Sequence, residues 1–204
     1  MQLIDRDTKI YCSFSSNPGN NGCIYFNTKF QENNINAIYK SFYSDNLEKS
    51  VEAVKTLNIA GFAISMPFKV EVLKYVDSID ISVKEIGAAN TILNINGHLK
   101  AYNTDWLGVK KYFTEPIETL TVVGNGGFSK AVQYFCKKDN IPFKLITREN
   151  WEDLNKAEGY VFNATPIDIE TTGILIDARP FTPQGMLIAG FQAYEQYKLY
   201  THEH

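Results

Sequence analysis

A short segment in the second half of the chain, Gly124-Asn125-Gly126-Gly127, has the composition of a nucleotide-binding turn. It follows the apolar run TLTVV and precedes a stretch whose apolar residues have helical spacing. Glycines at such a turn let the backbone approach a pyrophosphate, and the N-terminus of the next helix offers free N–H donors and a positive dipole. The segment therefore predicts dinucleotide binding. The alternative is an ordinary tight turn between a strand and a helix of an α/β protein.

The next expected strand, PFKLIT, ends in Thr147-Arg148, about 20 residues beyond the glycine turn. A site that prefers NAD usually carries Asp or Glu at this place, where the carboxylate binds the ribose 2′-hydroxyl. An arginine accommodates a 2′-phosphate better, because the two charges are opposite. Arg148 therefore indicates NADP, and the alternative is a surface arginine that faces solvent.

Three polar residues lie at the boundaries of predicted elements in the first half of the chain, namely Lys69, Asn90 and Asp105. Lys69 closes the segment Ser65-Met66-Pro67-Phe68-Lys69, directly after an apolar run. A single lysine or aspartate at such a place is usually a solvated charge. Composition alone therefore does not assign these residues to a site.

Local patterns predict several elements around these residues. Asp45 and Glu48 have the spacing of a capping box, and residues 47–57 then carry a helical apolar stripe. Gly61 to Met66 is a short apolar run, which predicts a buried strand. Asn96-Gly97 between TILNI and HLKAY predicts a hairpin with a two-residue turn.

The second half of the chain alternates strand and helix patterns. The expected strands are 119–123, 142–147, 159–165 and 173–178, and the expected helices are the one after the glycine turn, 151–157 and 186–200. Such alternation predicts a parallel sheet with right-handed crossovers. The fold class is therefore α/β.

Composition limits the classes of function. The 204 residues carry a net charge of −3, with 44% hydrophobic residues, which gives no broad attraction to nucleic acid or to an anionic membrane. No run approaches the roughly 20 apolar residues of a membrane span. Three unpaired cysteines and three histidines favour a reduced compartment and no metal site. We expect a soluble, cytoplasmic protein.

Six segments resemble, in order, the motifs of the shikimate dehydrogenase family. SMPFK resembles the family's T-V-P-F-K, EIGAANT its I-G-A-V-N-T, and YNTD its Y-N-T-D. VVGNGGFSKAV is similar to the G-A-G-G-A-x-x-A cofactor turn, Thr147-Arg148 to N-R-T, and NATP to N-A-T-P. The N-terminal segment is most similar to the divergent, shikimate dehydrogenase-like branch. Each motif is weak by itself, whereas the ordered series is specific.

The resemblance implies a role for each matching residue. The catalytic pair is Lys69 and Asp105, with lysine as the principal acid or base and aspartate as its orienting partner, although the reverse remains open. The substrate-binding residues are Ser13, Ser15, Ser65, Asn90 and Gln192, the two first serines holding the substrate carboxylate. The cofactor-binding residues are Gly124, Asn125, Gly126, Gly127, Arg148, Asn163 and Thr165. For Ser13 and Ser15 the alternative is a capped loop rich in serine and asparagine.

The resemblance also implies two domains. Residues 1–105 form an α/β substrate domain, joined by the C-terminal helix 185–204, and residues 106–184 form a small Rossmann-like domain with a parallel sheet. Two departures fall in the second domain, because the family's N-A-T-P-x-G-M becomes NATPIDI, with Asp168 in place of glycine, and the D-x-x-Y-x-P beyond it keeps no tyrosine. The connections there are too short for a full crossover, so we expect about four strands.

The activity that the resemblance implies is reversible, NADP-linked oxidation of shikimate to 3-dehydroshikimate, a step in the biosynthesis of aromatic amino acids. One alternative is the same fold acting on quinate or a related cyclic polyol. Another is a member that binds a ligand and has lost most turnover, since the cofactor half is trimmed. The expected partner is a small-molecule substrate, and the chain is expected to be a monomer or a homodimer.

Overall fold

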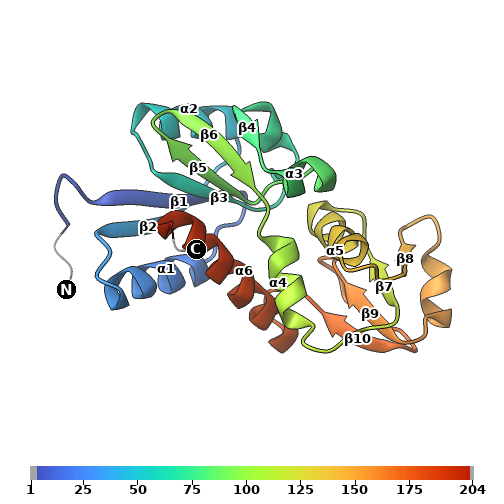
Figure 1. Ribbon diagram of the computed structural model, residues 1–204. Coiled ribbons are helices and arrows are strands. Elements are labelled where there is room, and N and C mark those ends of the chain that lie inside the picture. The colour runs from blue at the N-terminus through green and yellow to red at the C-terminus, as the bar shows by residue number, and fades with distance from the viewer. Residues whose placement is uncertain (1–3, 203–204) are drawn as a thin grey trace. The chain divides into compact units, whose positions relative to one another are not determined.

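The computed structural model describes residues 4–202, which form two compact units (Figure 1). Among these residues the first unit takes in 4–84, 88–103 and 196–202, and the second takes in 85–87 and 104–195. The long C-terminal helix α6 (Pro183–Thr201) therefore contributes to both. The expected α/β class with two sheets is confirmed. The limits of the functional domains at residues 105 and 185 stay a prediction.

A six-stranded mixed sheet forms the centre of the first unit. Its strands, in spatial order, are β2 (Ala37–Tyr43), β1 (Lys9–Ser15), β3 (Gly61–Ile64), β5 (Thr91–Ile95), β6 (His98–Tyr102) and β4 (Ser78–Ile79). Its helices are α1 (Asn21–Glu32), α2 (Leu47–Thr56), the 3₁₀ turn η1 (Glu71–Lys74) and α3 (Ile81–Ile86), the last of which ends in the second unit. The pairs β1–β2 and β1–β3 are parallel, so their carboxyl ends lie at one edge of the sheet.

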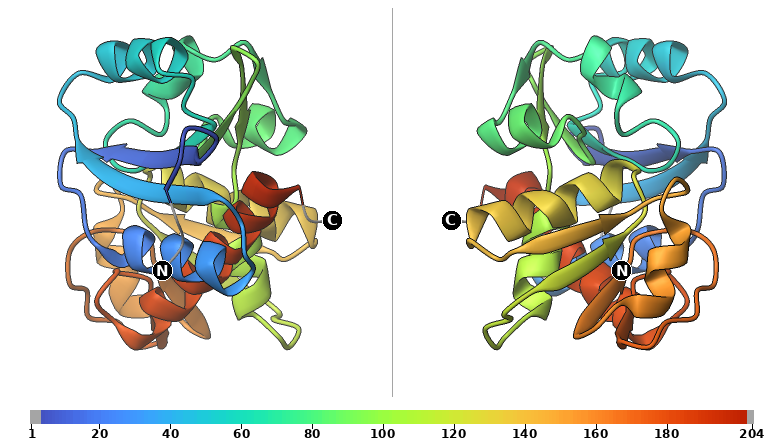
Figure 2. Two further views of the ribbon diagram at one scale, coloured as in Figure 1. Left: turned by 90° about the vertical axis from the view of Figure 1, so that its left-hand side faces the viewer. Right: turned by 90° about the vertical axis from the view of Figure 1, so that its right-hand side faces the viewer.

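Helices α2 and α1 cover opposite faces of this sheet (Figure 2). On β1, Cys12 and Phe14 point to the face covered by α2, where they join a buried aliphatic cluster. Tyr11 points to the opposite face and stacks on Tyr200 at the end of α6, with a ring centroid distance of 4.3 Å, while Phe30 of α1 lies beside it at 5.6 Å. Each fully buried large side chain contributes about 1.5–3 kcal/mol, so both cores hold the strand ends in place.

Two local predictions in the first unit have clear outcomes. The hairpin is confirmed, since β5 and β6 pair antiparallel around Asn96 and Gly97, whose φ angles of 54° and 89° fit a two-residue turn. The start of α2 was predicted one residue too early, because Asn46 rather than Asp45 is the N-cap and accepts a hydrogen bond from Lys49 N at 3.0 Å. The apolar stripe is also shorter than predicted, because Leu57 lies after the helix and is 67% exposed.

A four-stranded parallel sheet forms the centre of the second unit, which confirms the expected strand number. In spatial order the strands are β10 (Ile174–Asp177), β9 (Tyr160–Asn163), β7 (Leu120–Val123) and β8 (Phe143–Ile146). The helices are α4 (Asp105–Tyr112), α5 (Gly127–Lys138), the 3₁₀ turn η2 (Trp151–Lys156) and α6. Residues 164–173, which connect the parallel neighbours β9 and β10, contain no helix. The β10 edge therefore lacks the crossover helix that usually joins such strands.

One core of the second unit lies between α5 and the sheet, and another includes Leu154 of η2. Val132, Phe135 and Cys136 of α5 pack with Val122 of β7 and Phe162 of β9, and all five are buried. The predicted short helix at 151–157 is a 3₁₀ turn, and the C-terminal helix begins earlier than its apolar pattern indicates, at a proline. Within residues 4–202, no helix combines the length and the apolarity needed to cross a bilayer.

Candidate active site

In the first unit, three backbone hydrogen bonds, together called the seam, bring several predicted site residues close to one another. Ser65 N donates to Phe14 O at 3.3 Å, which places the residue after β3 beside the end of β1. Ile64 N donates to Asn90 O at 2.8 Å, and Ala89 N donates to Lys69 O at 2.8 Å. Ser65 and Lys69, from the segment after β3, thus meet Asn90, from the segment before β5, at one edge of the sheet.

The exposure of these residues differs in a way that suits different tasks. Asn90 is only 4% exposed, and its Oδ1 accepts a hydrogen bond from the Thr91 hydroxyl at 3.1 Å, which fixes the amide. Ser65 is exposed and Lys69 is partly buried. A fixed buried amide beside a reachable lysine and hydroxyl is an arrangement that can hold and orient a polar small molecule.

The two N-terminal serines lie on one face of β1, because strand residues two apart point the same way. The Ser13 hydroxyl donates to the Ser41 hydroxyl at 3.1 Å, and the Cys23 thiol donates to the same oxygen at 3.3 Å. Ser15 is 7% exposed at the end of the strand. Sequence reasoning missed Ser41 and Cys23, and only the register Ser13↔Ser41 reveals them.

In the second unit, Gln192 bonds to Thr104, the residue directly before Asp105. Gln192 Nε2 donates to Thr104 Oγ1 at 2.8 Å, and Asp105 is the first residue of α4 and 5% exposed. Gly108 makes this approach possible, because a Cβ there would lie 2.9 Å from Gln192 N and from Ile188 O. Sequence reasoning missed both Thr104 and Gly108, although a glycine one turn after Asp105 was a visible signal.

The catalytic pair predicted from the sequence is divided between the units. Lys69 belongs to the first unit and Asp105 to the second. The resemblance assigns them to one reaction, and their joint action stays a prediction.

The glycine turn of the second unit joins β7 to α5 and has the geometry that a dinucleotide turn needs. Gly124 has φ of +113°, which L side chains rarely adopt, and a Cβ there would meet Thr165 Cγ2 at 3.0 Å. Gly126 is the N-cap of α5, and no atom lies within 4 Å of the place a Cβ would take. A ligand can therefore approach the backbone at Gly126 closely, where N–H donors and the helix dipole favour an anion.

Arg148 and Asn125, both predicted to bind the cofactor, are exposed. Gly124 N donates to Ile146 O at 2.8 Å, which places the end of β8 beside the glycine turn. Thr147 N and Oγ1 donate to Asn150 Oδ1, at 2.8 and 3.3 Å, so the loop that carries Arg148 has a defined shape. The arrangement leaves the guanidinium accessible to a ligand at this edge of the sheet.

Asn163, the last residue of β9, and Thr165 are bonded to each other and shape the loop that follows the strand. Asn163 is 1% exposed, accepts hydrogen bonds from Thr165 N at 3.0 Å and Thr165 Oγ1 at 2.7 Å, and donates to Ile167 O at 2.9 Å. Ala164 N donates to Val123 O at 3.0 Å, so this loop borders the glycine turn. The side chain of Asn163 thus shapes the loop from inside, and any direct contact between either residue and a cofactor stays a prediction.

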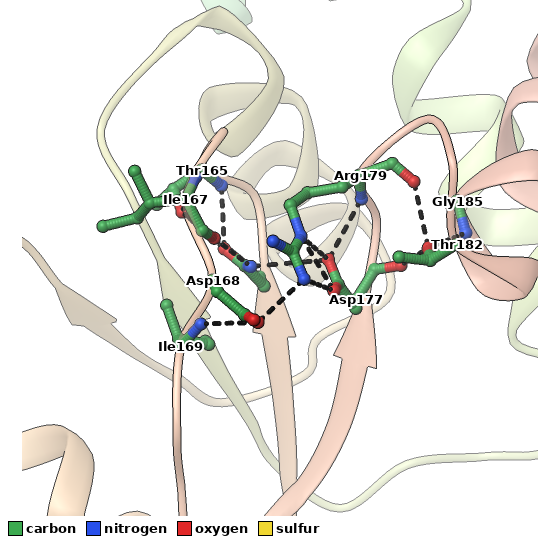
Figure 3. A network of polar contacts seen from close by, with 9 residues as sticks. Thr165, Ile167, Asp168, Ile169, Asp177, Arg179, Thr182 and Gly185 are labelled. Atoms are coloured by element: carbon green, nitrogen blue, oxygen red, sulfur yellow. Dashed lines mark hydrogen bonds and ion pairs between the residues drawn. The ribbon is translucent and has the colours of Figure 1, made fainter.

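The residue that replaces the family's glycine, Asp168, is part of an ion-pair network (Figure 3). Arg179 Nη2 lies 2.8 Å from Asp168 Oδ1 and 2.5 Å from Asp177 Oδ2. Arg179 Nε also bonds both carboxylate oxygens of Asp177, at 3.0 and 2.9 Å. This hydrogen bonding by Arg179 holds the pKa of Asp177 below its usual range, against a smaller opposing effect of burial.

The residues of the second unit fit a dinucleotide in part. The unobstructed Gly126, the uncapped start of α5 and the exposed Arg148 suit a pyrophosphate and a 2′-phosphate. The loop at Asp168 carries a carboxylate that shares Arg179 with Asp177. No group of three or more His, Cys, Asp or Glu side chains within residues 4–202 is placed to hold a metal ion.

Comparison with known sequences identifies relatives of both units. A family profile described as the shikimate dehydrogenase substrate binding domain matches residues 22–92. A shikimate dehydrogenase-like protein of Haemophilus influenzae is 37% identical over 134 residues, which are 64% of this chain and 49% of that protein. The shikimate dehydrogenase (NADP(+)) of Pyrococcus furiosus is 32% identical over 186 residues, which are 86% of this chain and 68% of that protein.

The chain spans about half to two thirds of the length of the curated relatives it matches. Among solved structures, a shikimate 5-dehydrogenase-like protein is similar with a TM-score of 0.81 and 26% sequence identity. That similarity covers 98% of this chain and 94% of the other chain.

Proposed function

This chain belongs to the shikimate dehydrogenase family, and we propose that it interconverts shikimate and 3-dehydroshikimate with NADP as cofactor. The observation that carries the proposal is the convergence of Ser65, Lys69 and Asn90 on one hydrogen-bonded seam of the first unit. The names of the curated relatives supply the reaction and the cofactor.

Removal of a hydride from a carbinol carbon requires a base that takes the hydroxyl proton, and the reverse reaction requires an acid. We assign that proton to Lys69 Nζ, with Asp105 as its orienting partner, and leave the reverse assignment open. Asn90 and Ser65 would orient the substrate hydroxyls.

The remaining substrate contacts follow from the same family roles. Ser13 and Ser15 would bind the carboxylate of shikimate, and the amide of Gln192, held by Thr104, would bind a hydroxyl. A site that bonds each polar group of a small substrate rejects analogues that lack one, because its own buried groups are then left unpaired.

NADP would supply the hydride acceptor when bound. The N–H groups at the start of α5 would bind its pyrophosphate, and Arg148 would bind the 2′-phosphate. The functional division is then residues 1–105 with 185–204 for the substrate and 106–184 for the cofactor. We further propose that the protein acts in the cytoplasm, as a monomer or homodimer.

A second candidate function is ligand binding with little turnover. It is favoured by the trimmed second unit, in which residues 164–173 contain no helix and Asp168 replaces a glycine. Such a protein would bind shikimate through the first unit and would bind NADP poorly.

The rate of NADPH formation, followed by its absorbance with shikimate and separately with quinate, tests the proposal. Faster formation with shikimate supports it, and faster formation with quinate favours the related polyol. If neither substrate produces NADPH while titration calorimetry still detects shikimate binding, the proposal is wrong and the ligand-binding function stands.

A further inference from the structure

Two departures from the family pattern contact each other in the second unit. Asp168 stands where the family has glycine, and Arg179 lies in the segment that lacks the family's tyrosine. Their side chains form an ion pair with an Nη2–Oδ1 distance of 2.8 Å (Figure 3). Each departure considered alone weakens the case for a cofactor site, whereas the ion pair joins the two segments that carry them.

The position of Arg179 is fixed by groups other than Asp168. Its side chain is 12% exposed, and the carboxylate of Asp177, which is 10% exposed, binds it through two nitrogens. The Arg179 carbonyl accepts a hydrogen bond from the Thr182 hydroxyl at 2.9 Å and occupies the place a Cβ of Gly185 would take. The guanidinium is thus held in place before it reaches Asp168, so little side-chain entropy is lost in forming that second contact.

The loop that Arg179 reaches is the loop that borders the glycine turn. Ile169 N donates to Asp168 Oδ1 at 3.2 Å. Thr165 Cγ2 lies 3.0 Å from the place that a Cβ on Gly124 would take. A shift of the loop would therefore change the space available beside the glycine turn.

We propose that Arg179 is a positioning residue of the cofactor site, which it serves by holding the 164–169 loop through Asp168. The proposal rests on the proposed function, since it needs an anionic dinucleotide at the glycine turn. Arg179 does not cancel the charge of Asp168, because the Asp177 carboxylate already pairs with the same guanidinium. Its contribution is the position of the loop that borders the glycine turn.

A double-mutant cycle on the full chain tests the proposal, with NADP and shikimate affinities measured separately by titration calorimetry. Arg179→Ala should weaken NADP binding at least about tenfold, which is 1.4 kcal/mol, and leave shikimate binding within about twofold. Asp168→Ala, which removes the loop's contact with Arg179 and keeps the Arg179–Asp177 pair, should weaken NADP binding as well. In the Asp168→Ala background, Arg179→Ala should cost less than about threefold, because the contact that holds the loop is already lost.

Arg179→Lys keeps the charge and loses the fork, so it should retain most of the NADP affinity and serves as the conservative control. Thermal unfolding of every variant verifies that the second unit is folded. If Arg179→Ala does not fold, Asp168→Asn provides the test, because loss of the ion pair to Arg179 should release the loop and weaken NADP binding.

Three results would overturn the proposal. An equal loss of NADP affinity from Arg179→Ala with and without Asp168 would show that Arg179 does not act through this carboxylate. Unchanged NADP affinity in Arg179→Ala, or in Asp168→Asn where that variant replaces it, would show that the pair has no role at the site. A wild-type chain that binds shikimate and does not bind NADP would instead reject the proposed cofactor and the role of Arg179 with it.

Discussion

The two units differ in how they hold the residues that lie where the strands of their sheets end. In the first unit, the residues at the edge match family motifs, and the backbone seam through Ser65, Lys69 and Asn90 holds them together. In the second unit, the edge combines a family-like glycine turn with an ion-pair network that the motifs do not account for. The family profile covers residues 22–92, entirely within the better-matched half of the chain.

This difference shows how a shortened unit can keep the shape of a site. A connection without a helix leaves β10 as an edge strand. The loop after β9 is held by the buried Ile169, which packs with Leu154 of η2, and by side-chain bonds from Asn163 and Arg179. Both units are therefore organised by a sheet, and the loop of the second unit depends in addition on a few polar contacts, which are sensitive to single substitutions.

The largest expected effect concerns the substrate half. Lys69→Ala should lower kcat about 10²- to 10⁴-fold and leave shikimate affinity nearly unchanged, because the lysine acts mainly by proton transfer in the transition state. Steady-state kinetics and titration calorimetry measure the two quantities. Lys49→Ala, at an exposed position of α2, is the matched control. A variant that keeps more than about a tenth of the wild-type rate would contradict the catalytic role.

The next effect concerns the cofactor half. Arg148→Ala should weaken NADP binding roughly 10- to 150-fold and leave NAD binding unchanged, because a charge-assisted bond to the 2′-phosphate is lost. Titration of both nucleotides measures the change, and Lys156→Ala, at an exposed position of η2, is the control for loss of a positive charge from the second unit. Equal NADP affinity in the two variants would show that Arg148 faces solvent in the complex.

A smaller effect tests how the second unit positions Gln192. Gly108→Ala should destabilise the protein by about 1–3 kcal/mol, because the added Cβ would lie 2.9 Å from backbone atoms of α6. Gly190→Ala is the matched control, since no atom lies within 4 Å of its Cβ position, and it should be neutral or stabilising by up to about 1 kcal/mol. Denaturant unfolding measures both. Equal stability of the two variants would contradict the close packing of α4 on α6.

The smallest expected effect is on how the free energy of unfolding depends on acidic pH, through Asp177 of the second unit. The pKa of Asp177 is lowered in the folded protein, so its ion pair stabilises the fold at pH values above the unfolded pKa of about 3.9. That stabilisation is lost as the pH falls through the lower folded pKa. Asp177→Asn should therefore flatten the fall in unfolding free energy between about pH 5 and pH 2, measured with urea. Asp45→Asn, at an exposed position of the first unit, is the control, and an unchanged slope in Asp177→Asn would refute the assignment.

Sequence patterns predicted the elements whose signals are local. The Asn96-Gly97 hairpin, the glycine turn before α5 and the four strands of the second sheet follow from turn chemistry and apolar runs. The start of α2 was misplaced by one residue because Asp45 and Asn46 are both good N-caps, and only the geometry of Asn46 decides between them.

Contacts between distant segments could not be predicted in the same way. The pairs Ser13–Ser41, Thr104–Gln192 and Asp168–Arg179 join residues that are far apart in sequence or lie in irregular loops. No periodicity links such residues, because strand register and loop closure decide their approach. The sequence placed Asp168 as a liability to cofactor binding, whereas the structure gives it a partner.

The central claim is that the substrate half of this protein is complete and the cofactor half is reduced. The most direct measurement is isothermal titration of the wild-type chain with NADP and with shikimate, each alone. We predict a high-micromolar or millimolar dissociation constant for NADP and a lower one for shikimate, because fewer groups enclose a nicotinamide beside a four-stranded sheet. NADP binding in the low micromolar range, or shikimate binding weaker than NADP binding, would contradict the account.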